Sequence, residues 1–467
     1  MERDTSVTEP TLALARFVAE TRGSALPARV RHEAKRAILN WLGCAIGASR
    51  HETVEAAIAA LAPFAGPAQA TVLGRSERFD ILHAALFNGL TSHTFDFDDT
   101  HLRTIIHPTG PVASALLALA EHMPVPGESF IDAFVLGTEV ECRIGNAVYP
   151  SHYDVGWHIT GTAGVFGAAA GAGRVLGLSE QHIVWALGIA ATQSSGLREM
   201  FGSMCKPLHV GLAARNGLAA ALLARENFTS AAQPIEGRRG FANVLATERD
   251  LSRITEGLGR TWELEANSYK PFPCGVVIHP AIDGCLQLRA AHALAPADID
   301  AIELAVHPLV LELTGKTSPR TGLESKFSVY HSAAVAIVDG AAGTAQYSDA
   351  RVGDPAVVAL RGRVRAHVDA ALKEDAAHVR IRLKDGLVLD RRVEHALGSL
   401  ENPMSDRDLE AKFRDLAASV LDDDEIEAIL TAGWSLERAA DSGRLARLTV
   451  PRREVRGAAS RAATRPI

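Results

Sequence analysis

Residues 162–178 read TAGVFGAAAGAGRVLGL, a run of small and apolar residues that contains a single charge. On a helix this run places apolar side chains on more than one face, which is typical of a helix buried in the middle of a bundle. Gly164, Gly167, Gly171 and Gly173 lack a Cβ and allow neighbouring backbones to approach closely. No predicted strand precedes them as a dinucleotide-binding fingerprint requires, so we interpret them as helix-packing positions.

The helical prediction extends outward from this run in both directions. Three further segments are rich in Ala, Leu and Gly: residues 113–121, 130–149 and 184–195. Apolar residues near helical spacing also occur at positions 12–18 and 34–41. We therefore predict that the chain is almost entirely helical as far as about Leu264.

The apolar pattern changes after Lys270 from a helical period to a period of two. Apolar and polar side chains alternate in three segments, residues 302–307, 364–368 and 379–383. The Lys-Asp-Gly turn at 384–386 then leads into apolar residues at 387 and 389, as in a hairpin. This alternation predicts a small antiparallel sheet, with a helix over residues 327–339 packed on it.

Past Pro403 the pattern is helical again, with Ser405 predicted as the N-cap and Asp408 as its capping partner. The predicted fold class is mainly α. It combines a large all-α helical domain with a smaller inserted α+β lid domain that carries the antiparallel sheet. The helical domain takes residues 1–268 and 404–450, the lid takes 269–403, and the basic end, 451–467, is predicted to be a flexible solvated tail.

Composition narrows the possible functions. The chain has 467 residues, of which 47% are hydrophobic, and its mean hydropathy is +0.06, as expected for a globular protein with a large core. A net charge of −7 argues against nucleic-acid and anionic-membrane partners. No signal peptide or membrane-spanning segment is visible. Five cysteines without regular spacing form no disulfide framework, so we expect a cytoplasmic location.

Residues 94–110, TFDFDDTHLRTIIHPTG, concentrate three carboxylates, two histidines and an arginine. Desolvating so many polar groups is costly unless they pair with one another or with a ligand, so this segment is a candidate site. A hydrogen-bonded helix end is the structural alternative. If the preceding helix runs through the segment, Asp96 and Thr100 share a face. His107 precedes a proline and is expected on a loop at the mouth of the next helix.

Four other segments combine histidine or lysine with small and apolar residues. They are GWHITGT (156–162), SMCKPLH (203–209), KPFPCG (270–275) leading into VVIHP (276–280), and SKFS (325–328). Taken singly, each histidine is more often a satisfied structural residue, and Lys206 alone would be interpreted as a surface lysine that extends its ammonium to water. Their joint occurrence favours a shared site.

Together these motifs resemble the MmgE/PrpD family, which includes 2-methylcitrate dehydratase, cis-aconitate decarboxylase and iminodisuccinate epimerase. The resemblance covers nearly the whole chain. It implies a helical domain with a smaller α+β lid, an active site between them, and a homodimer. The catalytic positions that it implies are Asp96, Thr100, His107, His158, Lys206 and His279, and we expect substrate contacts from His101, Arg103, Cys274 and Lys270.

The spacing from Thr100 to His107 is one residue longer than in the decarboxylase branch, which leaves His101 as an alternative to His107. Reactions of this family pass through a carbanion or enolate next to a carboxylate of a small polycarboxylate. Such a step needs a base that is neutral near pH 7, which histidine supplies, and a fixed positive charge, for which Lys206 and Arg103 are candidates. We expect His158 to be the principal base or acid and His107 its counterpart.

The predicted function is thus a metal-independent lyase without a cofactor. The reaction that we favour is dehydration of a 2-methylcitrate-like hydroxy acid. Epimerisation ranks second, and decarboxylation of a cis-aconitate-like acid is a further alternative. An iron–sulfur dehydratase is disfavoured because the cysteines show no C-x-x-C spacing. A prenyl-synthase-like Asp-Asp-x-x-Asp motif is excluded, because Leu102 occupies the position of the last aspartate. A cation site in Asp96, Asp98, Asp99 and His101, and a carboxylate-binding protein without turnover, stay open.

Overall fold

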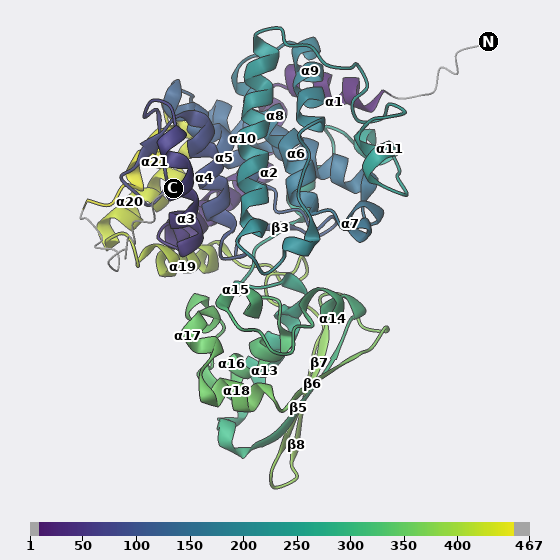
Figure 1. Cartoon of the computed structure of the whole chain (residues 1–467), viewed down its shortest axis with the longest axis vertical. Coiled ribbons are helices and arrows are strands. Elements are labelled where there is room, and N and C mark those ends of the chain that lie inside the picture. Colours follow the sequence, from purple (N-terminus) through teal and green to yellow (C-terminus); the bar gives the residue numbers. More distant parts are fainter. Residues whose placement is uncertain (1–8, 453–467) are drawn as a thin grey trace, which may run out of the picture.

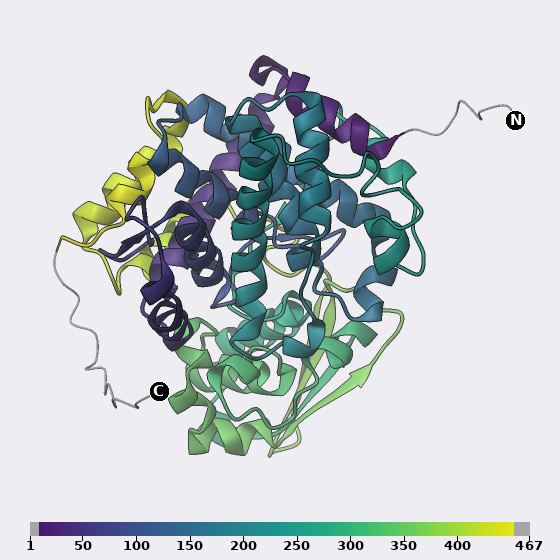
Figure 2. The same cartoon turned by 45° about the horizontal axis from the view of Figure 1, so that its top comes forward.

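The computed structural model describes residues 9–452 and has two lobes (Figure 1). A large helical domain lies above a smaller lobe of helices and strands, which we call the lid. Figure 2, tilted by 45°, shows the lid packed against the lower side of the helical domain. The predicted mainly α fold with a small sheet region is confirmed. Of the predicted tail 451–467, all but the first two residues lie outside the described part of the chain.

The run of small residues at 162–178 forms most of α8 (Ile159–Val175), which lies inside the helical domain. Three long helices pack around it: α5 (Thr109–His122), α6 (Gly127–Val148) and α10 (Cys205–Arg225). The backbones approach so closely that a Cβ on Gly167 of α8 would lie 2.9 Å from the carbonyl oxygen of Gly137 on α6. The helix-packing interpretation of these glycines is confirmed.

The remaining N-terminal helices surround this centre. They are α1 (Pro10–Glu20), α2 (Ala28–Ala48), α3 (Glu52–Leu61), α4 (Ile81–His93), α7 (Ser151–Val155), α9 (Glu180–Ala191), α11 (Phe241–Leu245) and α12 (Ser252–Thr255). A short ladder, β1 (Ala70–Thr71) with β2 (Arg78–Phe79), precedes α4. Every helix within residues 9–452 is too short or too polar to cross a bilayer.

The last helices return from the lid to the helical domain. They are α19 (Asp406–Ala417), α20 (Asp423–Trp434) and α21 (Arg444–Leu448). As predicted, Ser405 caps α19 and Asp408 completes a capping box. α19 packs on α2, where a Cβ on Gly43 would lie 3.0 Å from the Phe413 ring. Phe413 therefore needs a residue without a side chain opposite it.

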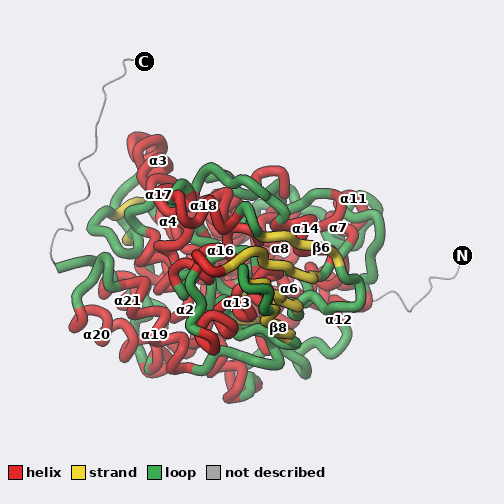
Figure 3. The backbone as a smooth tube through the Cα atoms, turned by 90° about the horizontal axis from the view of Figure 1, so that it is seen from below, coloured by secondary structure: helices red, strands yellow, loops and turns green. Residues whose placement is uncertain are grey.

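The lid is built on a four-stranded sheet, shown in yellow in Figure 3. Its strands are β5 (Ile299–Val306), β6 (Val364–Val368), β7 (Ala377–Leu383) and β8 (Val388–Val393), in the order β6-β5-β7-β8. β5, β7 and β8 are antiparallel as predicted, and the 384–386 turn joins β7 to β8. β6, however, runs parallel to β5, so the sheet is mixed. The long helical connection between β5 and β6 returns the chain to the same end of the sheet, which permits parallel pairing.

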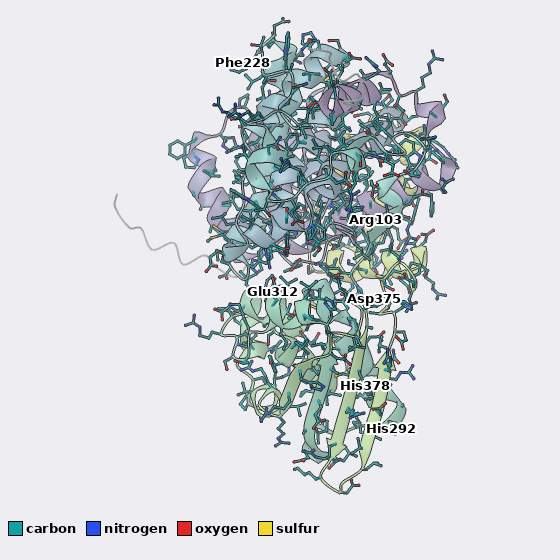
Figure 4. The ribbon with its side chains drawn as sticks, turned by 90° about the vertical axis from the view of Figure 1, so that its right-hand side faces the viewer. Arg103, Phe228, His292, Glu312, Asp375 and His378 are labelled. Atoms are coloured by element: carbon teal, nitrogen blue, oxygen red, sulfur yellow. The ribbon has the colours of Figure 1, made fainter. Side chains whose placement is uncertain are left out.

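Helices cover one face of this sheet. α13 (His279–His292) packs on β7 and β8, and α16 (Val329–Asp339), which matches the predicted helix at 327–339, packs on α13 and β6. The outer face is polar, with Arg380 and Arg382 exposed and His378 at the surface in Figure 4. Shorter lid helices are α14 (Pro308–Thr314), α15 (Gly322–Ser325), α17 (Asp349–Val352) and α18 (Pro355–Arg361).

The acidic segment after α4 is not helical, contrary to the arrangement considered above for Asp96 and Thr100. α4 ends at His93, and Asp96 has a left-handed backbone with φ 52°. Thr100 begins the short strand β3 (Thr100–His101), which pairs with β4 (Asn267–Ser268) at the entrance to the lid. The two residues therefore do not share a helical face. The β3–β4 ladder instead fixes this segment beside the chain that leads into the lid.

Candidate active site

A buried pocket lies where the helical domain meets the lid. Its lid side is formed by the segment before α13, by the end of α14 and by Phe327. Its cavity volume is about 40 Å³, room for a few water molecules. Of the predicted site residues, the structure brings six to this pocket: Asp96, Thr100, His107, His158, Lys206 and Lys270.

Asp96 lies at the centre of the charged side of the pocket. Its Oδ2 is 2.9 Å from Nζ of Lys206, at the start of α10, and its Oδ1 is 2.7 Å from Nζ of Lys270, which follows β4. Lys270 also donates to the backbone carbonyl of Asp96 at 3.0 Å. All three side chains are at most 6% exposed. The carboxylate thus joins the helical domain to the chain entering the lid.

These contacts fix the charges in the pocket. Burial alone would raise the pKa of Asp96, but Lys206 and Lys270 hold it well below its usual range. Burial lowers the pKa of Lys206, and Asp96 opposes that shift. The Lys206 ammonium also lies 5.0 Å from the Phe201 ring centre and 5.3 Å from that of Phe327, contacts that favour a cation. The pocket therefore holds two ammonium groups against one carboxylate.

His107 lies on the loop just before α5, as predicted. Its Nδ1 is 2.9 Å from the backbone carbonyl of Asp99, and a carbonyl only accepts, so Nδ1 carries the proton of the neutral ring. Nε2 is then the unprotonated atom, 3.9 Å from Oδ1 of Asp96. The backbone N–H of His107 donates to Oγ1 of Thr160 at 3.1 Å. Burial lowers the pKa of His107, so a neutral ring with a free Nε2 lone pair lines the pocket.

His158 is the N-cap residue of α8 and faces the pocket from the other side. Its backbone N–H donates to the carbonyl of Gly196 at 2.9 Å. Its Nδ1 lies 3.0 Å from Nδ1 of His209, which is three residues after Lys206 on α10. Burial, reinforced by Lys206, lowers the pKa of His158 well below its usual value. His158 is therefore a neutral imidazole at neutral pH.

Sequence reasoning missed His93 and His209. His93 is the last residue of α4, and its Nδ1 is 2.8 Å from Oδ2 of Asp98. Its ring packs against His107 at 4.5 Å and His158 at 5.8 Å between centres. Burial lowers the pKa of His93 to about 4. A histidine at the end of a helix next to an acidic segment is the signal that could have identified it.

Two buried lysines behind the pocket were also not selected as site residues, although Lys326 stands in the SKFS segment. Lys326 donates to the carbonyls of Phe95 and Pro273 at 2.7 and 2.8 Å. Lys412 of α19 donates to the carbonyls of Phe97 and Lys270 at 2.6 and 2.9 Å, and to Asn40. Burial lowers the pKa of each to about 8. Both lysines brace the backbone on either side of Asp96.

Two protein-family models match this chain. The model of the MmgE/PrpD N-terminal domain matches residues 12–254, and that of the MmgE/PrpD C-terminal domain matches residues 272–437. The chain belongs to the MmgE/PrpD family. The family resemblance expected from the motifs is confirmed. The C-terminal match includes the lid and also α19 and α20, which pack on the helical domain.

Two kinds of lyase are among the relatives. The chain is 29% identical over 451 residues to cis-aconitate decarboxylase of Aspergillus terreus (strain NIH 2624 / FGSC A1156), covering 89% of this chain and 91% of that protein. It is 29% identical to human cis-aconitate decarboxylase over 433 residues, covering 88% and 89%. It is 27% identical to 2-methylcitrate dehydratase of Cupriavidus necator over 397 residues, covering 78% and 81%.

Four residues expected at the site of this family member lie outside the pocket lining. His101 turns away, with Nε2 3.0 Å from Oε2 of Glu263. Arg103 pairs with the same Glu263 and its side chain is 62% exposed on the surface of the helical domain (Figure 4). The alternative between His101 and His107 is thereby decided in favour of His107 as the residue that faces the pocket. His101 follows Thr100 on β3, and neighbouring strand residues point to opposite sides, so Thr100 lines the pocket and His101 does not.

Cys274 and His279 are the other two expected residues that do not line the pocket. Burial raises the pKa of the Cys274 thiol to about 12, so this cysteine is a packed thiol in the lid core. His279 begins α13 behind Val276 and Val277, and burial lowers its pKa to about 3. His279 borders a neighbouring cavity that shares these two valines with the pocket.

The four-residue cation site considered from the sequence is not assembled, because His101 turns to Glu263 and Asp99 accepts from Thr109 and Asn267. A different group, His93, Asp96, Asp98 and His107, has ligand atoms within 4.8 Å of one another. Its carboxylates already have partners: Asp96 binds two ammonium groups and Asp98 binds His93. A divalent cation there would have to displace or face both lysines, so this donor set fits a metal poorly.

Proposed function

We propose that this family member is a lyase that forms a carbanion next to a carboxylate of a small polycarboxylic acid, without a metal. The observation that carries the proposal is the meeting of Lys206 with two neutral histidines, His107 and His158, in one buried pocket. A carbanion of this kind spreads its charge onto the adjacent carboxylate. A fixed ammonium in a water-poor site stabilises that charge far more than water would.

Each polar residue has a part in this scheme. His158 is the principal acid or base, and His107, with its free Nε2, is its counterpart across the pocket. Lys206 faces the developing enediolate and Lys270 binds a second carboxylate. Asp96 orients both lysines, and Thr100, whose Oγ1 is 3.5 Å from Nδ1 of His107, helps to fix that ring. A histidine that is neutral at pH 7 can accept a proton, and once it has been protonated it can donate one.

We place decarboxylation of a cis-aconitate-like acid ahead of the dehydration that was favoured on sequence alone. The cis-aconitate decarboxylases align over more of the chain than the dehydratase does. The lid-side lining is also apolar, with Val276, Val277 and Leu313. A carboxylate held against such a surface loses its charge when it leaves as CO₂, and exclusion of water favours that loss.

Dehydration of a 2-methylcitrate-like hydroxy acid is the second candidate, supported by the Cupriavidus necator relative. It requires one group to take the proton and another to protonate the departing hydroxyl, which His107 and His158 could divide between them. Epimerisation uses the same proton abstraction and ranks third.

The direct test offers purified enzyme cis-aconitate and 2-methylcitrate separately and follows products by NMR. Release of CO₂ from the first acid supports decarboxylation, and loss of water from the second supports dehydration. His158→Ala, folded by circular dichroism, should lose activity by about 10²-fold or more. His292→Gln is the matched control, because this exposed histidine lies on the lid in Figure 4, away from the pocket. Binding of either acid without conversion would favour the carboxylate-binding protein instead.

Two further parts of the proposal have separate tests. Activity should survive dialysis against a chelator, because the carboxylates of the pocket already pair with protein cations and histidines. The homodimer implied by the family resemblance stays a prediction, for which sedimentation at micromolar concentration should give twice the mass of 49.6 kDa.

A further inference from the structure

The contact between His158 and His209 has a property that a single histidine lacks. Their Nδ1 atoms lie 3.0 Å apart. Two nitrogens can form a hydrogen bond only if one carries the proton and the other accepts it. The Nε2 state of each ring follows from that choice. If His158 donates from Nδ1, its Nε2 is a free lone pair, and if it accepts, its Nε2 carries the proton.

The surrounding backbone is shaped to hold His209 in this position. Gly196 has φ +127°, a conformation that side chains disfavour, and a Cβ there would lie 3.1 Å from the His209 ring. A Cβ on Gly161, in the first turn of α8, would lie 3.1 Å from Cβ of His209. The same Gly196 accepts the backbone N–H of His158 through its carbonyl. Two glycines thus leave room for the second ring next to the first.

The charges around the two rings differ in a way that favours moving a proton outward. His158 is faced by Lys206 and His209 of α10, by His93 of α4 and by His107. Of these groups, only His93 and Lys206 contribute to lowering the pKa of His209. His158 is 2% exposed and His209 is 7% exposed. A positive charge is therefore less costly on His209, which is nearer to water, than on His158.

We propose that His209 is a positioning residue that relays the proton between His158 and solvent. The proposal rests on His158 being the acid–base group of the function proposed above. The proposal gives a role to His209, which is not among the catalytic positions that the family resemblance implies. Lys206 and His209 are three residues apart on one face of α10, so one helix presents both the charge that stabilises the carbanion and the relay.

The relay balances as two linked proton transfers. The substrate C–H bond breaks, its electron pair stays on carbon, and the proton bonds to Nε2 of His158. At the same time Nδ1–H of His158 breaks and that proton bonds to Nδ1 of His209. His158 is again neutral, and His209 is an imidazolium that releases its Nε2 proton to water. In the reverse direction Nε2 of His209 takes a proton from water, and the Nδ1 proton of His209 moves to Nδ1 of His158. At the same time His158 delivers its Nε2 proton to the carbanion left after loss of CO₂, and both rings are again neutral.

His209→Asn and His209→Ala in the full-length enzyme test the relay. Asparagine keeps an amide near the position of Nδ1 and can hydrogen-bond to His158, but it cannot accept the proton. We expect both variants to fold and kcat to fall by about tenfold or more, with KM little changed. Imidazole added to His209→Ala should restore the rate in proportion to its neutral concentration. In a series of methylimidazoles, the restored rate should rise with the basicity of the compound added. A merely structural role of His209 would not produce that dependence.

The probes are cis-aconitate and 2-methylcitrate, with His292→Gln as the control variant. Retention of wild-type kcat and of the wild-type pH profile by His209→Asn would overturn the relay, as would failure of every imidazole to raise the rate of His209→Ala. Failure of the underlying function gives a different result, since the wild-type enzyme itself would then convert neither acid.

Discussion

Replacing Asp96 by asparagine should be among the most damaging single changes in the helical domain. Asp96 is 3% exposed, and its carboxylate pairs with Lys206 and Lys270 at 2.9 and 2.7 Å. Asparagine has the same shape and keeps an oxygen for one hydrogen bond, but it has no charge. Two ammonium groups would then be buried beside each other without a counter-ion, and their mutual repulsion would add to the loss.

Removing one partner of a buried ion pair costs about 3–5 kcal/mol, and the two contacts to Asp96 place this variant at the upper end. For a domain of this size such a loss lowers Tm by roughly 5–10 °C. Differential scanning fluorimetry at pH 7 measures it. The same change removes the carboxylate that raises the pKa of Lys206. The alkaline limb of any remaining activity should therefore shift to a lower pH than in wild type.

A double-mutant cycle with Lys206→Met separates the ion pair from other effects. The double variant should be more stable than the sum of the two single changes predicts, by about 1 kcal/mol or more. An Asp96→Asn protein that melts within 1 °C of wild type, with additive behaviour in the cycle, would refute the reasoning.

Three other predictions follow from burial and charge. Burial lowers the pKa of the pocket histidines and of Lys206, so the histidine bases stay neutral at pH values below their ordinary pKa of about 6.5 and the ammonium is lost below its ordinary pKa of about 10.5. The acid limb of the kcat/KM profile should therefore lie below about pH 6.5 and the alkaline limb below about pH 10.5, and an acid limb above about 6.5 would contradict this reasoning. Arg103→Ala should keep kcat/KM within about twofold, because the Arg103 side chain is 62% exposed and does not line the pocket; a tenfold rise in KM would assign Arg103 to substrate binding. Glu141→Met should raise the unfolding free energy by about 1 kcal/mol in urea, because both carboxyl oxygens are buried without a partner in residues 9–452; a loss of stability would show that the carboxyl group is needed.

The fold could be predicted where a single period dominates a segment. The Ala/Gly run of α8, the alternation of β5, β7 and β8, and the capping box of α19 each follow from local pattern. The direction of β6 does not, because strand pairing depends on the path of the helices between β5 and β6. The short β3–β4 ladder joins residues far apart in sequence, and two-residue strands carry no period.

The sequence predicted which residues contribute to the site, but it did not predict which of their side chains face the pocket. The motifs identified Asp96, His107, His158, Lys206 and Lys270, which meet in the pocket. Which side of β3 faces that pocket depends on pairing with β4, so the sequence could not show that Thr100 lines the pocket and His101 turns away.

The residues that were missed share a physical reason. His93, His209 and Lys412 occupy positions where an apolar residue is the usual expectation, on the buried sides of helices. Each is tolerated because it has a specific partner: Asp98 for His93, His158 for His209, and backbone carbonyls for Lys412. Such partners become visible only once the fold brings them together.

Deuterium incorporation from D₂O, followed by NMR with cis-aconitate and 2-methylcitrate, tests most directly whether this pocket forms a carbanion beside a carboxylate. Wild-type enzyme should place deuterium on the carbon next to a carboxylate, either in the acid itself or in the product left after loss of CO₂, and Lys206→Met should slow this by about 10²-fold or more. Equal rates for the two proteins, or no deuterium in either acid or in its product, would contradict the account.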